Sequence, residues 1–283
     1  KRDKVWFWFS TRYNSVKGEA GIFTNANAFN PNAWLYVPTT TPAVNKGQQF
    51  NNSIRVTWQV NPKVKVAGTY KADKWCNCPN QISATRAPEA ARDRRFPRLR
   101  QEHAEITSPI TNKLLFEAVG LHLFERWGDM HLRADGGSLA DAALRALLPE
   151  LISVTEQSNN LIYRGRENNN NTLVPNWSYR AAVAYVTGTH ALKFGFNRTH
   201  GFLNEYQYAM NPVSYRFNTV GGVTTPNQIT QMNRPYRAIS NLDNDFGMFA
   251  QDRWTMDRVT LNLALRYDQF QSSFPEQTVG SAP

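Results

Sequence analysis

Alternation of apolar and polar side chains is the feature that most constrains what this chain can fold into. In residues 258–271 the apolar side chains stand at Val259, Leu261, Leu263, Leu265 and Tyr267, and the positions between them are polar or small. Successive side chains of a β-strand point to opposite faces of its sheet. The pattern therefore predicts a strand with one apolar face and one polar face.

The alternation recurs in pairs of segments joined by short turns. The predicted pairs are 49–60 with 63–74, 100–108 with 113–126, 176–186 with 190–202, and 244–256 with 258–271, and a further strand is predicted at 4–14. The connections between pairs are long and rich in Asn, Gly, Thr and Pro, as in 15–49, 75–100, 127–175 and 203–243. Every second connection is long, so an up-and-down antiparallel sheet would carry long loops at one end only.

Lipid is the surface that best suits such strands. Sheets cross a bilayer only as closed barrels with an apolar exterior, because every backbone polar group must be satisfied internally. One-sided long loops are typical of outer-membrane barrels, whose single bacterial chains have an even number of strands. Nine predicted strands therefore indicate an incomplete, all-β, up-and-down transmembrane β-barrel over residues 1–283, one part of a larger barrel.

Composition refines this prediction. Aromatic residues make up 12% of the chain although hydrophobic residues reach only 41%, which suits aromatic girdles at the two membrane interfaces. The girdle candidates near strand ends are Trp6, Trp8, Tyr13, Trp58, Tyr70, Trp127, Trp177, Trp254 and Tyr267. The net charge of +10 includes a dense basic run at 91–100 without evident periodicity. We interpret this run as a solvated loop facing anionic lipid headgroups, and we expect no nucleic-acid partner.

The remaining motifs point away from catalysis. The five histidines lack metal-ligand spacing, and no nucleophile or phosphate-loop motif occurs, so we expect no enzyme activity and no catalytic, metal or cofactor site. Cys76 and Cys78 could form only a strained disulfide and are too few for zinc. A capping pattern at Ser138 predicts one short loop helix over 139–151. The chain contains no apolar run long enough for a transmembrane helix and opens like a strand in mid-course, so we expect either a cytosolic protein or an internal piece of a longer one.

Four stretches resemble the first part of the barrel in TonB-dependent outer-membrane receptors, most closely the Oar-like group, whose members carry a carboxypeptidase-regulatory-like domain. They are "KRDKVWFWFSTRYN", "TSPITNKLLFEAVG", "GTHALKFGFNRTH" and "FGMFAQDRWTMDRVTLNLALRYDQF". The resemblance implies a plugged barrel that takes up nutrients with energy from the inner membrane. It also implies as partners outer-membrane lipid, a plug domain and the TonB energy-coupling complex, the last two through an N-terminal part missing here. Its ligand would be a small molecule, such as a chelate, an oligosaccharide or a peptide.

Phase and loop position give the candidate site residues. The predicted lumen-facing side chains are Arg55, Gln59, Arg180, Lys193, Asn262 and Arg266. The predicted ligand-binding side chains in loops are Trp75, Trp127, Tyr163, Arg166, Tyr206, Tyr208 and Tyr215, since rings stack on ligands and guanidinium groups pair with anions. Packing within the loops is the alternative role for each of these.

Two other functions fit the same pattern. A passive porin-like barrel would need its own even set of strands and no plug. A secreted soluble β-sandwich that binds carbohydrate would use the aromatic side chains on a sheet whose apolar face is covered by a second sheet.

Overall fold

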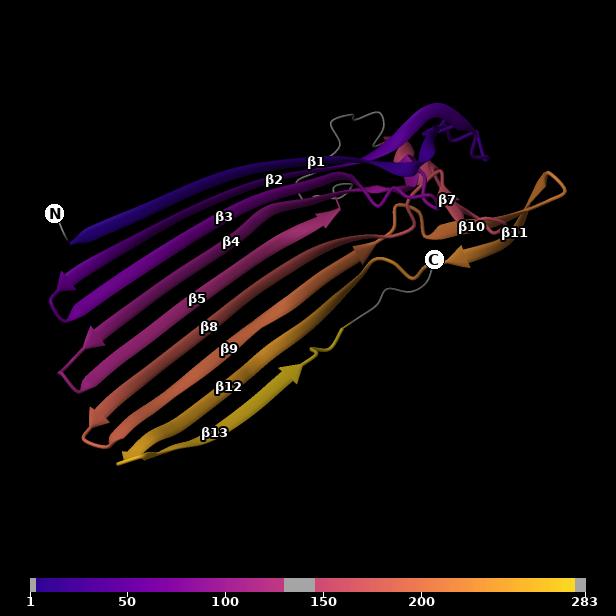
Figure 1. Cartoon of the computed structure of the whole chain (residues 1–283). Helices are drawn as coiled ribbons and strands as arrows, with labels where there is room; N and C mark the ends of the chain where they lie inside the picture. The colour runs from indigo at the N-terminus through magenta and orange to yellow at the C-terminus, as the bar shows by residue number, and fades with distance from the viewer. Residues whose placement is uncertain (1–3, 130–145, 278–283) are drawn as a thin grey trace.

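Nine long strands form one antiparallel sheet in the computed structural model, which describes residues 4–129 and 146–277. Figure 1 shows them side by side, in the order β1-β2-β3-β4-β5-β8-β9-β12-β13. Their bounds are β1 Val5–Asn25, β2 Pro38–Asn61, β3 Val64–Asn80, β4 Arg92–Pro109, β5 Leu114–Asp129, β8 Asn169–Thr187, β9 His190–Tyr208, β12 Tyr236–Met256 and β13 Val259–Ser273. Each strand pairs with the strand of this same sheet that follows it in the chain, so the predicted fold class is confirmed.

The short turns all lie at one end of the sheet, at the left of Figure 1. Residues 62–63, 110–113, 188–189 and 257–258 make these turns. Gly188 and Asp257 open two of them with φ of 53° and 45°. Positive φ at the first turn position matches the right-handed twist of the flanking strands, which is why two residues suffice.

The strands extend well beyond the predicted ranges at the other end. β1 has 21 residues and β2 has 24, so most of the predicted 15–49 loop is paired strand, with Val16 opposite Gly47. The basic run at 91–100 is the start of β4 rather than a solvated loop, so the expectation of a loop there was wrong. Polar composition suggested loops, but polar strands are stable wherever water can solvate their side chains and a neighbour satisfies their backbone.

A second, four-stranded sheet lies at the end with the long connections (Figure 1). Its order is β11-β10-β6-β7, with β6 Ser153–Glu156, β7 Leu161–Tyr163, β10 Val213–Val220 and β11 Val223–Gln231. A small core of Ala87, Val154, Leu161, Tyr163 and Phe217 holds it together. These segments were expected to be irregular loops, because each strand is too short to show a period by itself.

Two further predictions concern the same connections. Most of the predicted 139–151 helix lies outside the described residues, and its described end contains a 3-10 turn at Leu148–Glu150. Cys76 and Cys78 form a disulfide within β3. Within the described ranges, no helix has the length and apolar character to cross a membrane.

The register of the sheet separates two chemically different faces. One row takes a residue from every strand, each directly opposite the next, and all its members are apolar: Val5, Trp58, Val66, Ile106, Ala118, Ala181, Phe196, Met248 and Tyr267. Many side chains of this face are open, including Phe7 at 80% and Leu265 at 77% exposed. We call it the apolar face. Among the described residues no second sheet covers it, which is contrary to what a soluble sandwich requires.

Aromatic side chains mark the boundaries of the apolar face. Trp58, Tyr185 and Trp254 lie on it near the short turns, and Tyr70, Trp177 and Tyr179 lie on it toward the other end. Trp6 and Trp8 were expected in these girdles but pair with Thr57 and Arg55 on the opposite, polar face. Trp127 also lies on the polar face, opposite Thr172, so the girdle prediction was wrong for these three residues.

Charge placed on the apolar face should destabilise the protein far more than charge placed one residue away. Leu263→Arg in the full-length protein should lower the free energy of unfolding from lipid vesicles by about 2–4 kcal/mol if Leu263 lies near the bilayer midplane. Ala264→Arg is the matched control, because Ala264 lies on the polar face opposite Gln251. Urea titration of both variants measures the difference, and equal losses would contradict the assignment of the faces.

Candidate functional site

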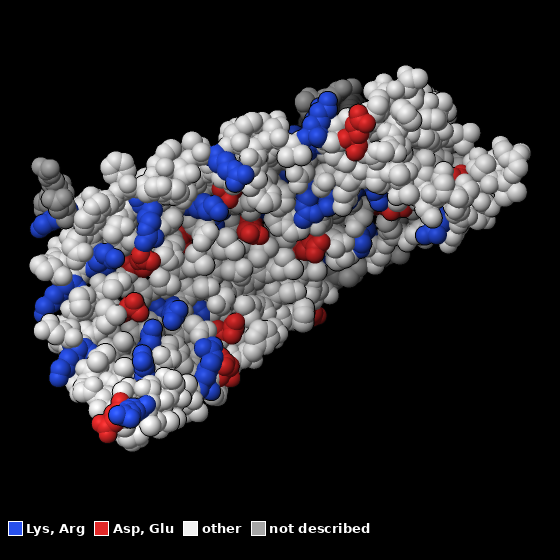
Figure 2. Space-filling view, viewed as in Figure 1, with Lys and Arg blue, Asp and Glu red and all other residues white. Residues whose placement is uncertain are grey.

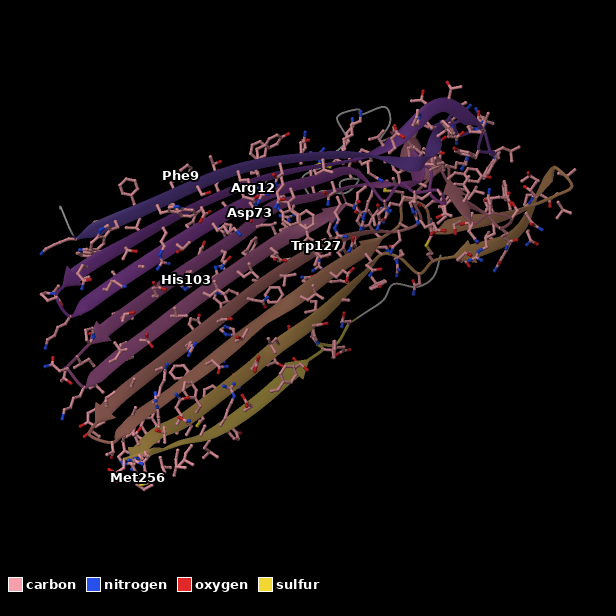
Figure 3. All side chains as sticks on the ribbon, in the orientation of Figure 1. Phe9, Arg12, Asp73, His103, Trp127 and Met256 are labelled. Carbon is pink, nitrogen blue, oxygen red and sulfur yellow. A yellow bond between two sulfur atoms is a disulfide. The ribbon has the colours of Figure 1, made fainter. Side chains whose placement is uncertain are left out.

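Six side chains predicted to face a lumen share the polar face of the sheet. The register places Arg55, Gln59, Arg180, Lys193, Asn262 and Arg266 on this face. Figure 2 shows charges of both signs along the sheet, and Figure 3 labels four side chains of this face, Arg12, Asp73, His103 and Trp127.

Ion pairs and hydrogen bonds connect side chains of the polar face, both between strands and within one strand. The Arg55 guanidinium pairs with Glu105 two strands away and donates to Thr69 Oγ1 at 3.1 Å. Lys193 Nζ lies 3.9 Å from Glu117. The Arg266–Asp268 pair has its shortest contact at 2.6 Å and lies over Gly247, where any Cβ would collide with both side chains. The charged and polar side chains of this face suit contact with water and not packing in a hydrophobic core.

An aromatic row lies where β3, β4 and β5 reach the end with the long connections. The ring of Phe96 has its centroid 5.2 Å from that of Trp75 and 6.0 Å from that of Trp127. The Arg94 guanidinium lies 4.0 Å above Trp127. Two of the predicted ligand-binding residues thus come together through a ring that joins them and a cation that covers one of them. Such a row offers flat surfaces for stacking beside a positive charge.

A buried charge cluster adjoins this row. The side chain of Asp129 is fully buried, and its carboxylate lies 3.3 Å from Arg92 Nη1 and 3.9 Å from Arg166 Nε. The backbone N–H of Asn170 donates to Asp129 Oδ2 at 3.0 Å. Tyr208 donates its hydroxyl to the Asp129 backbone carbonyl at 3.3 Å. One carboxylate therefore fixes the ends of β4, β5 and β8 and the predicted site residue Arg166.

Positive charge exceeds negative charge in this cluster. Burial lowers the pKa of Arg166 to about 10, with the Asp129 carboxylate acting in the opposite direction, so its guanidinium is charged at neutral pH. Arg92 Nε and Arg166 Nε are buried without a hydrogen-bond partner among the described residues. Two guanidinium groups share Asp129, and Arg94 stands beside them. We call these residues, with the aromatic row, the mouth cluster: Trp75, Arg92, Arg94, Phe96, Trp127, Asp129 and Arg166.

The other predicted ligand-binding residues have different surroundings. Tyr163 is only 2% exposed and packs in the core of the four-stranded sheet, where burial raises the pKa of its hydroxyl to about 12. Tyr215 packs against that core. Tyr206 stacks on Tyr208 at 5.7 Å, and Tyr208 is 2% exposed. The structure gives Tyr163, Tyr208 and Tyr215 packing contacts, the alternative role considered for them.

Sequence reasoning missed Arg92, Arg94, Phe96 and Asp129. The first three stand at every second position in the basic run, a strand period that Pro97 and the density of arginines obscured. Asp129 gave no signal, since its importance depends on burial between two arginines distant in sequence. Arg164 was also missed, because its contacts come from segments distant in sequence. Its guanidinium lies 3.8 Å above Trp34 and donates to four backbone carbonyls, those of Pro31, Ala33, Glu150 and Ile152.

The sheet has an exposed apolar face, a polar face with several ion pairs, and long connections at one end only. Together these features define a wall segment of a membrane-spanning β-barrel. The sequence matches the model of the outer membrane beta barrel domain over residues 16–280. The chain belongs to that family, and its place is the bacterial outer membrane.

Solved structures show the same fold. The outer membrane transporter YddB from Escherichia coli is 11% identical, with a TM-score of 0.55 over 95% of this chain and 33% of that one. The copper transporter OprC is also 11% identical, with a TM-score of 0.53 over 99% of this chain and 34% of that one. The chain thus spans about a third of the length of these proteins. A comparison with curated proteins found no match.

Removing the charge of Asp129 should destabilise the mouth cluster strongly. Asp129→Asn leaves two nearly buried guanidinium groups without their counter-charge, an arrangement that typically costs about 3–5 kcal/mol. Asp268→Asn is the control, since it breaks a solvent-exposed ion pair with Arg266, and such pairs contribute little to stability. Thermal unfolding of the full-length variants compares the two losses, and similar melting temperatures would contradict the described role of Asp129.

Proposed function

We propose that this chain is part of a TonB-dependent outer-membrane receptor and transporter, in which it supplies barrel wall and extracellular ligand-capturing surface. Membership of the outer-membrane barrel family and the likeness of its fold to a third of two transporters support this. Within that class, the resemblance of the four quoted stretches favours the Oar-like group. The rest of the barrel, the plug domain and the contact with the TonB complex would come from other parts of a longer protein.

The observation that carries the proposal is the mouth cluster itself. It lies on the polar face at the end with long connections, which in outer-membrane barrels is the extracellular end. Stacked rings beside excess positive charge suit a small ligand that combines a flat or ring-shaped part with negative charge. Such a ligand would bind at the mouth and then pass along the wall carrying Arg55, Gln59, Arg180, Lys193, Asn262 and Arg266, once the plug moves.

Conductance separates this function from that of a passive porin. The full-length protein reconstituted in planar bilayers should show no steady ion conductance, because a plug would occlude the lumen. Conductance should appear when urea unfolds the plug while the barrel persists. A steady open channel without denaturant would contradict the proposal and favour the porin-like alternative.

The mouth cluster should account for ligand affinity. Trp127→Ala with Arg94→Gln removes one ring and its cation, which together contribute about 1–2 kcal/mol, or roughly five- to thirtyfold in Kd. Quenching of tryptophan fluorescence by a panel of ferric chelates and acidic oligosaccharides measures the loss. Trp8→Ala is the control, since Trp8 is an exposed ring of the polar face at the short-turn end. Equal losses in both variants would argue against capture at the mouth.

A further inference from the structure

A cluster of cations lies on the outside of the wall, on the face opposite the mouth cluster. Arg98 on β4 stands directly opposite Arg126 on β5, and both side chains are exposed. In the part of the chain that the structure describes, neither guanidinium has an ion-pair or hydrogen-bond partner. Like charges directly opposite each other on one face of a sheet are destabilising, so this pair calls for an anion from outside the chain.

Two further cations extend the patch. Arg100 lies two residues from Arg98 on the same face, with its guanidinium 4.9 Å above the ring of Phe124. Lys74 lies on β3 between Asp73, which pairs with Leu99, and Trp75, which pairs with Phe96, and its side chain is exposed. We call Lys74, Arg98, Arg100 and Arg126 the outer cation cluster. The Glu102 carboxylate of this face lies 3.9 Å from Arg100 and is also held at 3.0 Å by His122.

The height of the cluster on the wall identifies its surroundings. On β5 the same face carries Leu114, Phe116, Ala118 and Gly120 in turn, then His122, Phe124 and Arg126. The eleven residues from Leu114 to Phe124 make ten steps along the strand, which span about 24 Å along the membrane normal at a rise of about 3.4 Å per step and a tilt of about 45°. That matches the apolar band of outer-membrane barrels, about 25 Å tall. Arg98 and Arg126 therefore lie just beyond the hydrocarbon, at headgroup level on the long-loop side.

We propose that the outer cation cluster binds the phosphate groups of a lipid in the leaflet at the long-loop end of the barrel. Guanidinium groups bind phosphate through two parallel hydrogen bonds, and cations near an anionic membrane surface are attracted to it. The lipid phosphate supplies the charge that the Arg98–Arg126 pair lacks within the chain. This inference rests on the outer-membrane placement and does not depend on the proposed transport function.

The test uses the full-length protein in neutral detergent and bisphosphorylated lipid A as the probe, with bound lipid counted by native mass spectrometry. R98Q/R126Q should weaken binding at least about tenfold, whereas R98K/R126K should retain part of the affinity because the charges remain. K113Q/R258Q is the matched control, since both residues are exposed at the short turns and their loss should leave Kd unchanged. The affinity of the parent protein should fall as salt is raised.

Three results would overturn the proposal. The first is equal affinity of the parent and R98Q/R126Q for bisphosphorylated lipid A. The second is equal affinity of the parent for lipid A stripped of its phosphates. The third is displacement of the lipid by soluble polyphosphate at equal phosphate concentration, which would indicate a site for a free polyanion instead. Because neutralisation relieves a like-charge contact, R98Q/R126Q should melt no lower than the parent, so a loss of binding reports on recognition.

Discussion

Exposure of one apolar face on a sheet whose backbone is otherwise paired is the constraint on which the rest of this structure depends. A nine-stranded meander pairs each inner strand with a neighbour on both sides, but it leaves large side chains such as Phe7 and Leu265 exposed. Exposing these side chains to water would be unfavourable, and the hydrocarbon of a membrane covers them without a second protein layer. The alternation, the short turns and the all-apolar row across the strands are consequences of this one solution.

The polar ends of the strands, beyond the apolar face, carry the candidate functional site. Because β1 and β2 continue as paired strand into polar sequence, the sheet forms a rigid scaffold beyond the bilayer. The four-stranded sheet and the mouth cluster are built on this scaffold. Asp129 links three strand ends to Arg166, so a candidate binding surface rests on paired backbone instead of on a mobile loop. The same strands carry cations on their outer face, so the proposed ligand capture and the contact with the membrane would take place on opposite faces of one sheet.

Sequence reasoning predicted the sheet well because its signal is local. An alternation with a period of two can be recognised within ten residues. The nine strands, their pairing, and the assignment of Leu261 and Asn262 to opposite faces therefore follow from the residues alone. The extensions of the strands at the end with the long connections were missed, because strands that lie outside the membrane can be polar on both faces and then show no apolar alternation. The Trp6 and Trp8 assignment failed because ring type does not reveal strand face when both positions adjoin other aromatics. The mouth cluster needed long-range pairing, since Asp129 contacts Arg92 and Arg166 from distant segments.

The most direct test of the central claim is a nitroxide scan along β2 from Ser53 to Val60 in the full-length protein reconstituted in lipid vesicles. The account predicts a strict period of two: labels at Ile54, Val56 and Trp58 are relaxed by oxygen dissolved in the hydrocarbon, and labels at Ser53, Arg55 and Thr57 by a water-soluble nickel chelate. A period of two in which the first three positions are accessible to neither reagent would show that protein covers the apolar face, and it would contradict the account.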